Sequence, residues 1–401
     1  MPKGDNDKGV GAAGTERLYY SDARLLTFEA RVVDREESGR RIYLDRTAFY
    51  PTSGGQPNDI GTLGGIRVVD VVDEEARIAH LLEAPLAAEQ ASGVVDGARR
   101  FDHMQQHTGQ HLLSAVFEDL FGRRTASVHF GDQLSTVDLE GGPLTPEQIR
   151  AAEARANALV TENRPVSVSF EESATAMGLR KPSDRAGVIR IVSIEGLDRS
   201  ACGGTHVAAT GELGAILLRK VEKAKGQLRV EFLCGGRASR QARGDYDLLA
   251  GLAQGMSAAI DELPGLVEAQ RAELKTVAAA RWDAEEQLAR YRAAERHAGL
   301  VPGPDGTRWI VERLPSGTTD QLRTLALAVA DLPRAVFVGV IDSPPTLLLA
   351  ASADSGVNAG SLLKERVTEV GGRGGGSPRL AQGTVPDSAA LAAVLARLLV
   401  D

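Results

Sequence analysis

The spacing of hydrophobic and polar positions changes along the chain and divides it into regions. From Leu18 to about Asp96, short runs of alternating apolar and polar residues are separated by turn-forming residues. The runs are LLTFEARVV, RRIYLD, GGIRVVDVVD and ARIAHLLEA. Several short strands at this spacing predict a small β-barrel, which we place at residues 15–98.

From Arg99 the period becomes that of a helix. Met104–Phe121 has apolar residues at helical spacing, and Leu144–Asn163 predicts a second helix with Thr145 as its N-cap and Pro146 at its first position. Strand-like runs lie between and after these helices: ASVHFG, STVDLEG, VSVSFEE, VIRIVSIEG, GAILLRKVEK and LRVEFLCGG. The mixture predicts an α+β domain over residues 99–240.

Beyond residue 240 the sequence predicts a helical region without strands, followed by a region in which strands and helices alternate. Residues 241–298 are rich in Ala, Glu, Arg and Leu and predict one long helix or a helical hairpin, a spacer or a coiled-coil arm. Strands and helices alternate again over residues 299–401, which predicts a separate α/β domain. Within it, Gly371–Gly383 is so rich in glycine that we expect a break or loop. Residues 1–14 are polar and predict a disordered tail. The whole is an α+β multidomain protein.

Composition and charge limit the class of protein. A hydrophobic content of 43% is enough for packed cores, and no run of about 18 apolar residues predicts a membrane span. Two cysteines exclude a disulfide framework and favour a reducing, cytoplasmic setting. A net charge of −8 argues against a protein that coats nucleic acid indiscriminately, but it leaves room for a local basic face.

Two pairs of side chains have the spacing of metal ligands. His107 and His111 lie four apart on a predicted helix and therefore share one face, and Cys202 and His206 are also four apart. Three imidazoles and a thiolate are a ligand set suited to zinc. His103 lies one turn earlier, and we expect it to be a neighbour of the site, structural or facing RNA.

What such a metal would do stays open at this level. A metallopeptidase is disfavoured because no glutamate lies between His107 and His111. A cysteine held by zinc is a ligand rather than a nucleophile. If all four side chains bind the ion, the site is closed and structural, whereas displacement of one would admit water or a substrate group.

Four motifs, taken together, resemble a known family. They are FYPTSGGQP (Phe49–Pro57) followed by Asp59 and Gly61, HTGQHLLSA (His107–Ala115), CGGTH (Cys202–His206), and EFL (Glu231–Leu233) followed by GGRA (Gly235–Ala238). In this order they resemble the editing domain of alanyl-tRNA synthetases, and more closely the free-standing alanyl-tRNA editing proteins of the AlaX family. Gly371–Gly383 is similar to the DHH-associated C-terminal domain of the long AlaX proteins.

The resemblance implies a hydrolase that acts in trans on mischarged tRNA(Ala), chiefly seryl-tRNA(Ala), with glycyl-tRNA(Ala) as a second substrate. It implies Zn²⁺ held by His107, His111, Cys202 and His206. Because only the short tail precedes the predicted barrel, we expect no aminoacylation core.

The catalytic candidates are Gln110 and His129. Gln110 stands before the second histidine, where many synthetases carry threonine, and His129 lies on a predicted strand where many carry glutamine. We expect one of them to position water or the serine hydroxyl. A strand histidine that is partly buried and hydrogen-bonded is the alternative for His129.

Substrate and RNA contacts are expected in four places. Gln56 belongs to a loop rich in glycine and proline, and Gly203, Gly204 and Thr205 separate two candidate ligands. From residue 187 to 240, nine basic and five acidic residues give a local charge of +4, which favours phosphate contacts by residues such as Arg219, Lys220 and Arg237. Arg373 lies in the glycine-rich segment, whose N–H groups could face phosphate. The alternative for the basic residues of 187–240 is a solvated, charged hairpin. The alternative for the glycine-rich segment is a flexible connector.

Two other functions remain open. One is a non-catalytic tRNA-binding protein with a structural zinc, and the other is a metallohydrolase of a small phosphate ester, for which no Asp-His-His core is evident. The helical arm and the C-terminal domain could pair two chains into a homodimer, although a helix packed on its own domain fits as well.

Overall fold

The computed structural model describes residues 14–400 apart from residues 174, 182–186 and 225. The chain divides into two compact units, Met1–Leu252 and Ala253–Asp401. Except for Gly14, the tail predicted at residues 1–14 lies outside the described residues. No helix of the described part is long and apolar enough to cross a membrane.

The first unit begins with a closed ring of six strands in the order β2-β3-β7-β6-β5-β8. The elements of this part are β1 (Glu16–Arg17), η1 (Leu18–Tyr20), β2 (Thr27–Arg35), β3 (Arg41–Leu44), β4 (Arg46–Thr47), β5 (Gly61–Leu63), β6 (Ile66–Glu74), β7 (Arg77–Leu82) and β8 (Gln90–Val95). The four strands read from the sequence form β2, β3, β6 and β7. The short strand β5 and the strand β8 that complete the ring were not predicted, because β5 has only three residues and β8 has few large apolar side chains.

One close contact explains the composition of β8. Strands β2 and β8 alternate buried and exposed residues, so that Phe28 and Ala91 point into the ring. A Cβ atom on Gly93 would lie 2.3 Å from the ring of Phe28, its cross-strand partner. Glycine at this position therefore allows the phenyl ring to lie flat across β8.

The rest of the first unit combines helices with two antiparallel sheets. Its elements are α1 (Gly97–Phe121), β9 (Thr125–Phe130), β10 (Ser135–Leu139), α2 (Pro146–Thr161), β11 (Val166–Glu172), β12 (Val188–Ile194), β13 (Asp198–Ala201), η2 (Thr210–Leu213), β14 (Ile216–Ala224), β15 (Gln227–Cys234) and α3 (Gly236–Gly255). One sheet has the order β14-β15-β10-β9 and the other β11-β12-β13. The predicted N-cap at Thr145 and Pro146 at the start of α2 are confirmed, and Thr145 forms a capping box with Gln148.

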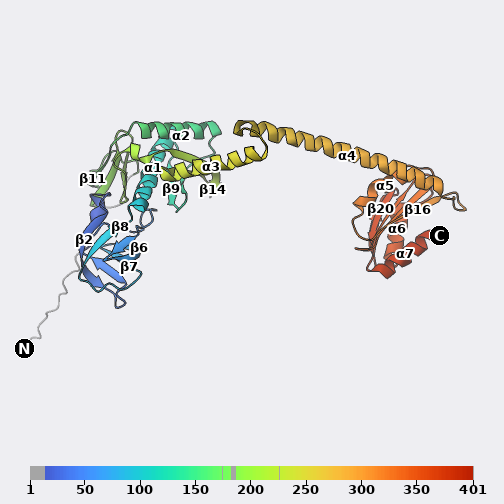
Figure 1. The fold of residues 1–401 in the computed structure, drawn as a ribbon, viewed down its shortest axis with the longest axis horizontal. Helices are drawn as coiled ribbons and strands as arrows, with labels where there is room; N and C mark the ends of the chain where they lie inside the picture. The colour runs from blue at the N-terminus through green and yellow to red at the C-terminus, as the bar shows by residue number, and fades with distance from the viewer. Residues whose placement is uncertain (1–13, 174, 182–186, 225, 401) are drawn as a thin grey trace, which may run out of the picture. The chain divides into compact units, whose positions relative to one another are not determined.

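Helix α1 connects the ring to these sheets, as Figure 1 shows. It begins at Gly97, seven residues before the predicted start at Met104. The sequence did not predict this first turn because a buried ion pair stabilises it, whereas the prediction relied on apolar residues at helical spacing. The guanidinium of Arg100, 1% exposed, bonds both carboxylate oxygens of Asp59, and one of its Nη atoms donates to the carbonyl of Ala23. The ring and the helix are thereby fixed to each other.

The second unit is a five-stranded sheet with helices, entered through a long helix. Its elements are η3 (Ile260–Glu262), α4 (Leu263–Gly299), β16 (Arg308–Leu314), α5 (Asp320–Ala330), β17 (Ala335–Ile341), β18 (Thr346–Ala351), α6 (Ala359–Thr368), β19 (Arg373–Gly376), β20 (Leu380–Thr384) and α7 (Ser388–Val400). The strand order is β16-β17-β18-β20-β19. Near the end of α4, Ala289 and Ala293 are buried against α5 and β17.

The glycine-rich segment corrects a prediction. Gly371–Gly383 was expected to be a break, but it contains β19 and most of β20, which pair as an antiparallel hairpin. Glycine is needed here because helix α6 packs on the hairpin: a Cβ atom on Gly374 would lie 2.9 Å from Gly383 and 3.0 Å from Val367. A strand that carries almost no side chains has no hydrophobic pattern to read.

Candidate metal centre and its cavity

Four side chains from one helix and one loop converge at one point of the first unit. His107 and His111 come from α1, and Cys202 and His206 lie on either side of the loop that follows β13. One ligand atom from each lies within 4.8 Å of all the others. The Cys202 Sγ atom is 3.4 Å from His107 Nε2 and 3.3 Å from His206 Nε2. The cluster could therefore hold a metal ion.

Each imidazole has a polar partner on its other nitrogen. His107 Nδ1 lies 2.8 Å from Gln56 Oε1, His111 Nδ1 lies 2.7 Å from Asp198 Oδ2, and His206 Nδ1 lies 3.1 Å from Thr108 Oγ1. These contacts turn each Nε2 toward the common point. Metal-binding histidines in proteins are commonly oriented by such partners.

The surroundings of Cys202, His111 and His206 shift the pKa values of these three groups. Burial alone would raise the pKa of the Cys202 thiol, but the charges of His107 and His206 and the hydrogen bonds of His107 and His111 hold it well below its ordinary value. Burial alone would lower the pKa of His111, yet its hydrogen bonds to Asp198 and Cys202 raise it to about 10. Burial is the largest cause of a His206 pKa of about 3. The cluster therefore favours a thiolate, which is the form that binds metals.

Two glycines allow the cluster to assemble. A Cβ atom on Gly109, between the two helical histidines, would lie 2.2 Å from Cys234 Sγ of β15. A Cβ atom on Gly204 would lie 2.2 Å from His107 Cε1. Strand and loop backbones can thus approach α1 only because both positions lack a side chain.

The cluster opens into a cavity of about 1660 Å³. His107, His111 and Cys202 line it, as does Arg190. Arg190 is 8% exposed and donates to the carbonyls of Cys202 and Gly204, so that it fixes the loop between the last two candidate ligands. The cavity can thus receive a substrate next to the cluster.

A chain of polar side chains runs along the cavity wall. Gln110 Nε2 donates to Ser114 Oγ at 2.8 Å, and Thr125 Oγ1 donates to the same oxygen at 2.7 Å. All three residues line the cavity. A hydroxyl or an amide of a bound substrate would find hydrogen-bonding partners here.

The remaining predicted substrate contacts divide into two groups. Gly203 and Gly204 line the cavity. Gln56 and Thr205 do not reach its surface, because they are buried and bonded to each other, with Gln56 Nε2 2.8 Å from Thr205 Oγ1. Gln56 therefore positions His107 and the loop rather than meeting RNA directly in this structure.

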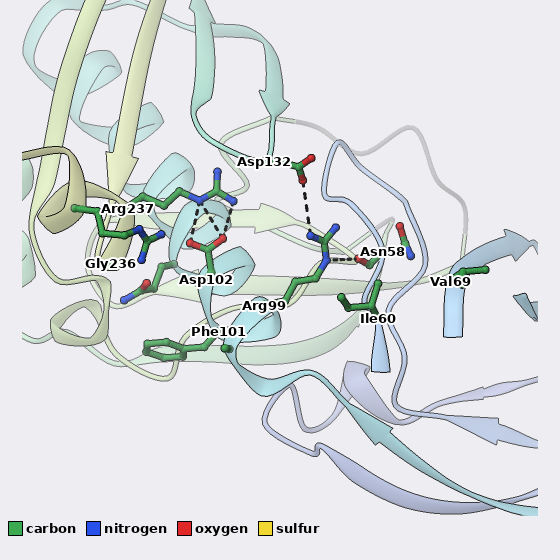
Figure 2. A pocket seen from close by; sticks show the side chains of 12 residues that line it. Asn58, Ile60, Val69, Arg99, Phe101, Asp102, Asp132, Gly236 and Arg237 are labelled. Carbon is green, nitrogen blue, oxygen red and sulfur yellow. Dashed lines mark hydrogen bonds and ion pairs between the residues drawn. The ribbon is translucent and has the colours of Figure 1, made fainter. Parts of the chain in front are cut away.

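The predicted basic contacts are mostly engaged within the protein. Arg237 is buried and bonds Asp102 and the carbonyl of Gly131, beside a separate pocket shown in Figure 2. Arg219 pairs with Asp245, and Lys220 pairs with Glu222. The local charge of +4 counted Lys225, which lies outside the described residues. Arg373 is exposed on β19 in the second unit.

The structure does not bring His129 to the cluster. Its side chain is exposed on β9 and is not among the residues that line the cavity, whereas Ser127 and Val128 are. The predicted partial burial of His129 is therefore wrong. His103 is 3% exposed, and its Nδ1 atom has no hydrogen-bond partner among the described residues. Its burial fits the structural role rather than contact with RNA.

Sequence reasoning missed the residues that orient the site. Thr108 follows a candidate ligand directly, and Asp198 lies four residues before another, so both could have been found by inspecting the neighbours of the ligands. Arg190 and Thr125 carry no such signal, because long-range packing alone brings them to the cavity.

Comparison with known proteins agrees with this architecture. The family model described as "Threonyl and Alanyl tRNA synthetase second additional domain" matches residues 189–231, and the DHHA1 domain model matches residues 306–399. The chain thus combines an additional domain of the threonyl and alanyl tRNA synthetase class with a DHHA1 domain.

Full-length relatives narrow the class. The chain is 31% identical to the alanyl-tRNA editing protein AlaX-L of Pyrococcus horikoshii over 92% of this chain and 94% of that one. It is 32% identical to the alanine–tRNA ligase of Natronomonas pharaonis, of which it covers 43%, over 96% of its own length. It is 38% identical to the alanyl-tRNA editing protein Aarsd1 of Mus musculus over 56% of each chain. The chain therefore belongs to the family of alanyl-tRNA editing proteins, and it spans less than half the length of the ligases it matches.

Proposed function

We propose that this protein is a trans-acting editing hydrolase that removes the amino acid from mischarged tRNA(Ala), chiefly from seryl-tRNA(Ala) and also from glycyl-tRNA(Ala). The observation that carries the proposal is the convergence of His107, His111, Cys202 and His206 at the wall of a cavity large enough for an aminoacylated nucleotide. The reaction adds water across the ester between the amino acid and the terminal ribose, and the acyl C–O bond breaks.

The donor set fits Zn²⁺. Three imidazoles with polar partners on their other nitrogens and one thiolate are ligands that zinc prefers. We assign His107, His111, Cys202 and His206 as its ligands. A zinc ion held there would supply positive charge beside the ester, which can position the substrate or stabilise negative charge.

Gln110 is the residue to which we assign recognition at the reacting end of the substrate. Its amide is held by Ser114, which also accepts from Thr125. A site that hydrogen-bonds a hydroxyl can reject an analogue that carries only a methyl group, because its polar groups would lose their partner. Serine can thus be separated from alanine on this wall.

We propose a division of labour along the chain. The editing domain of residues 99–240 carries the chemistry, the ring at residues 15–98 closes one side of the cavity, and the DHH-associated domain at residues 299–401 contributes to tRNA binding, with Arg373 as an exposed candidate. Both cysteines are free thiols, which fits the cytoplasm, where we place the activity.

We also propose that two copies pair through the helical arm at residues 241–298. Leu274, Val277, Leu288 and Tyr291 on α4 are between 50% and 76% exposed. Their spacings of three, eleven and three residues fit the apolar positions of a seven-residue repeat. Such a stripe on a long helix is suited to a matching helix of a second chain.

The experiment is to follow loss of the ester from seryl-tRNA(Ala) with the wild type, Cys202→Ala and His107→Ala. We expect the wild type to hydrolyse it while leaving alanyl-tRNA(Ala) intact, and both variants to lose about 100-fold or more in rate. His297→Ala, in the second unit, is the control and should keep the wild-type rate.

The same assay distinguishes the alternative function. A non-catalytic tRNA-binding protein with a structural zinc would bind seryl-tRNA(Ala) and leave its ester intact. Wild-type turnover that both cluster variants retain would instead show that the cluster has no part in the reaction.

A further inference from the structure

The cavity has an exposed aromatic side chain at its edge that the hydrolytic chemistry does not use. Phe170 on β11 lines the cavity and is 54% exposed, and Val188 on β12 lines it as well and is 62% exposed. Large apolar groups exposed next to each other beside a cavity commonly mark a binding surface. The question is which ligand would cover them.

The aromatic group is connected to the metal cluster by a continuous wall. Phe170 is the cross-strand partner of Arg190. The guanidinium of Arg190 lies 5.4 Å from the ring centre of Tyr20 and also bonds the carbonyl of Cys202. Tyr20 itself lines the cavity and is half-buried. Phe170, Arg190 and Tyr20 therefore lead from solvent to the candidate ligands.

Basic groups lie along the same cavity. Arg124 and Lys181 line it; the side chain of Arg124 is 76% exposed, with its Nε atom 3.7 Å from Oε1 of Glu118, which lines the cavity as well. Aromatic faces beside exposed cations are the combination that single-stranded nucleic acids need, since the rings stack on bases and the cations meet phosphates. An apolar protein segment would have no use for these cations.

We propose that Phe170 stacks on an unpaired nucleobase of a single-stranded RNA 3′ end and so guides its terminal nucleotide along this wall to the cluster. The inference rests on the proposed function, because it describes how the same substrate is held. Phe170 is a positioning residue: it acts on a base that precedes the ester and leaves the reacting atoms to other groups.

The test measures binding of the full-length protein to two RNA hairpins. One hairpin ends in four unpaired 3′ nucleotides, and the other has the same stem with a blunt end. The variants are Phe170→Ala, Phe170→Trp and, as a matched control, Tyr246→Ala, whose side chain on α3 is also 54% exposed. Circular dichroism checks that each variant folds.

We expect the wild type to prefer the hairpin with the overhang, and Phe170→Ala to lose that preference by about tenfold, which is within the range of one base–aromatic stack. Phe170→Trp should retain it, and Tyr246→Ala should not change it. With seryl-tRNA(Ala), Phe170→Ala should raise KM and leave kcat near the wild-type value.

Two results would overturn the inference. One is an unchanged overhang preference in Phe170→Ala, and the other is an equal loss of affinity for both hairpins, which would indicate lost folding or phosphate contact rather than lost stacking. If the wild type hydrolysed no aminoacyl ester, the proposed function would fail, while the binding comparison would still decide on the stacking role.

Discussion

At the scale of single residues, the candidate centre depends on side chains that hydrogen-bond the four candidate metal ligands and would not themselves contact the metal. Asp198 is the clearest case, because its buried carboxylate accepts from His111 Nδ1 at 2.7 Å and also pairs with Arg180. The carboxylate fixes the orientation of the His111 ring and makes Nε2 of that ring more basic, so that it binds a metal ion more strongly. A partner of this kind determines affinity without contacting the ion.

Asp198→Asn should therefore weaken metal binding while keeping the shape of the side chain. We expect the affinity for Zn²⁺ to fall by about 10- to 100-fold, measured by competition with a chelator. Asp342→Asn, which removes the partner of Arg313 in the second unit, is the control and should bind Zn²⁺ like the wild type. Equal affinities in the wild type and Asp198→Asn would contradict the assigned role.

At the scale of elements, the sequence predicts what local patterns determine and misses what distant contacts determine. The N-cap of α2 at Thr145 followed from three adjacent residues. The first turn of α1 did not, because Arg100 is held there by Asp59, 41 residues earlier. In the candidate site, His107 and His111 were found from their helical spacing, whereas Arg190 reaches its place only through the folded sheet.

The packing of α1 on β15 gives a prediction at the same scale. Gly109→Ala should destabilise the first unit by roughly 1–3 kcal/mol, although alanine favours helices, because the new Cβ would lie 2.2 Å from Cys234 Sγ. Urea unfolding followed by circular dichroism measures this loss. Trp282 and Trp309 both lie in the second unit, so tryptophan fluorescence should show an unchanged transition there.

A second substitution tests the cause of that loss. Cys234→Ala removes the sulfur atom, and the nearest remaining Cys234 atom, its Cβ, would lie 3.5 Å from the new methyl group, an ordinary contact. The double variant Gly109→Ala/Cys234→Ala should therefore be more stable than the sum of the two single effects implies. Strict additivity would show that the clash is not what destabilises Gly109→Ala.

At the scale of the whole molecule, the surfaces proposed for hydrolysis and for self-association belong to different parts of the chain. Several cations of residues 187–240 pair with acids of the same unit, as Arg219 does with Asp245, so net charge alone does not identify an RNA surface. The apolar stripe of α4 belongs to the second unit, whereas the residues that line the cavity all belong to the first. Self-association and hydrolysis should therefore be separable by mutation.

Leu274→Lys combined with Leu288→Lys should convert a dimer into a monomer without changing hydrolysis per chain. Light scattering should show a mass near twice 42.4 kDa for the wild type and near 42.4 kDa for the variant. Val33→Lys on β2, outside the arm, is the matched control, since Val33 is 48% exposed and Leu288 is 50% exposed. A monomeric wild type would reject the pairing.

Metal analysis of the purified protein, together with X-ray absorption at the zinc edge, decides whether the four side chains of the cluster bind zinc. We expect one zinc per chain, bound by one sulfur at about 2.3 Å and three nitrogens at about 2.0–2.1 Å. In Cys202→Ala we expect the zinc and its sulfur ligand to be lost. A protein without stoichiometric metal, or a zinc shell without sulfur, would contradict this assignment.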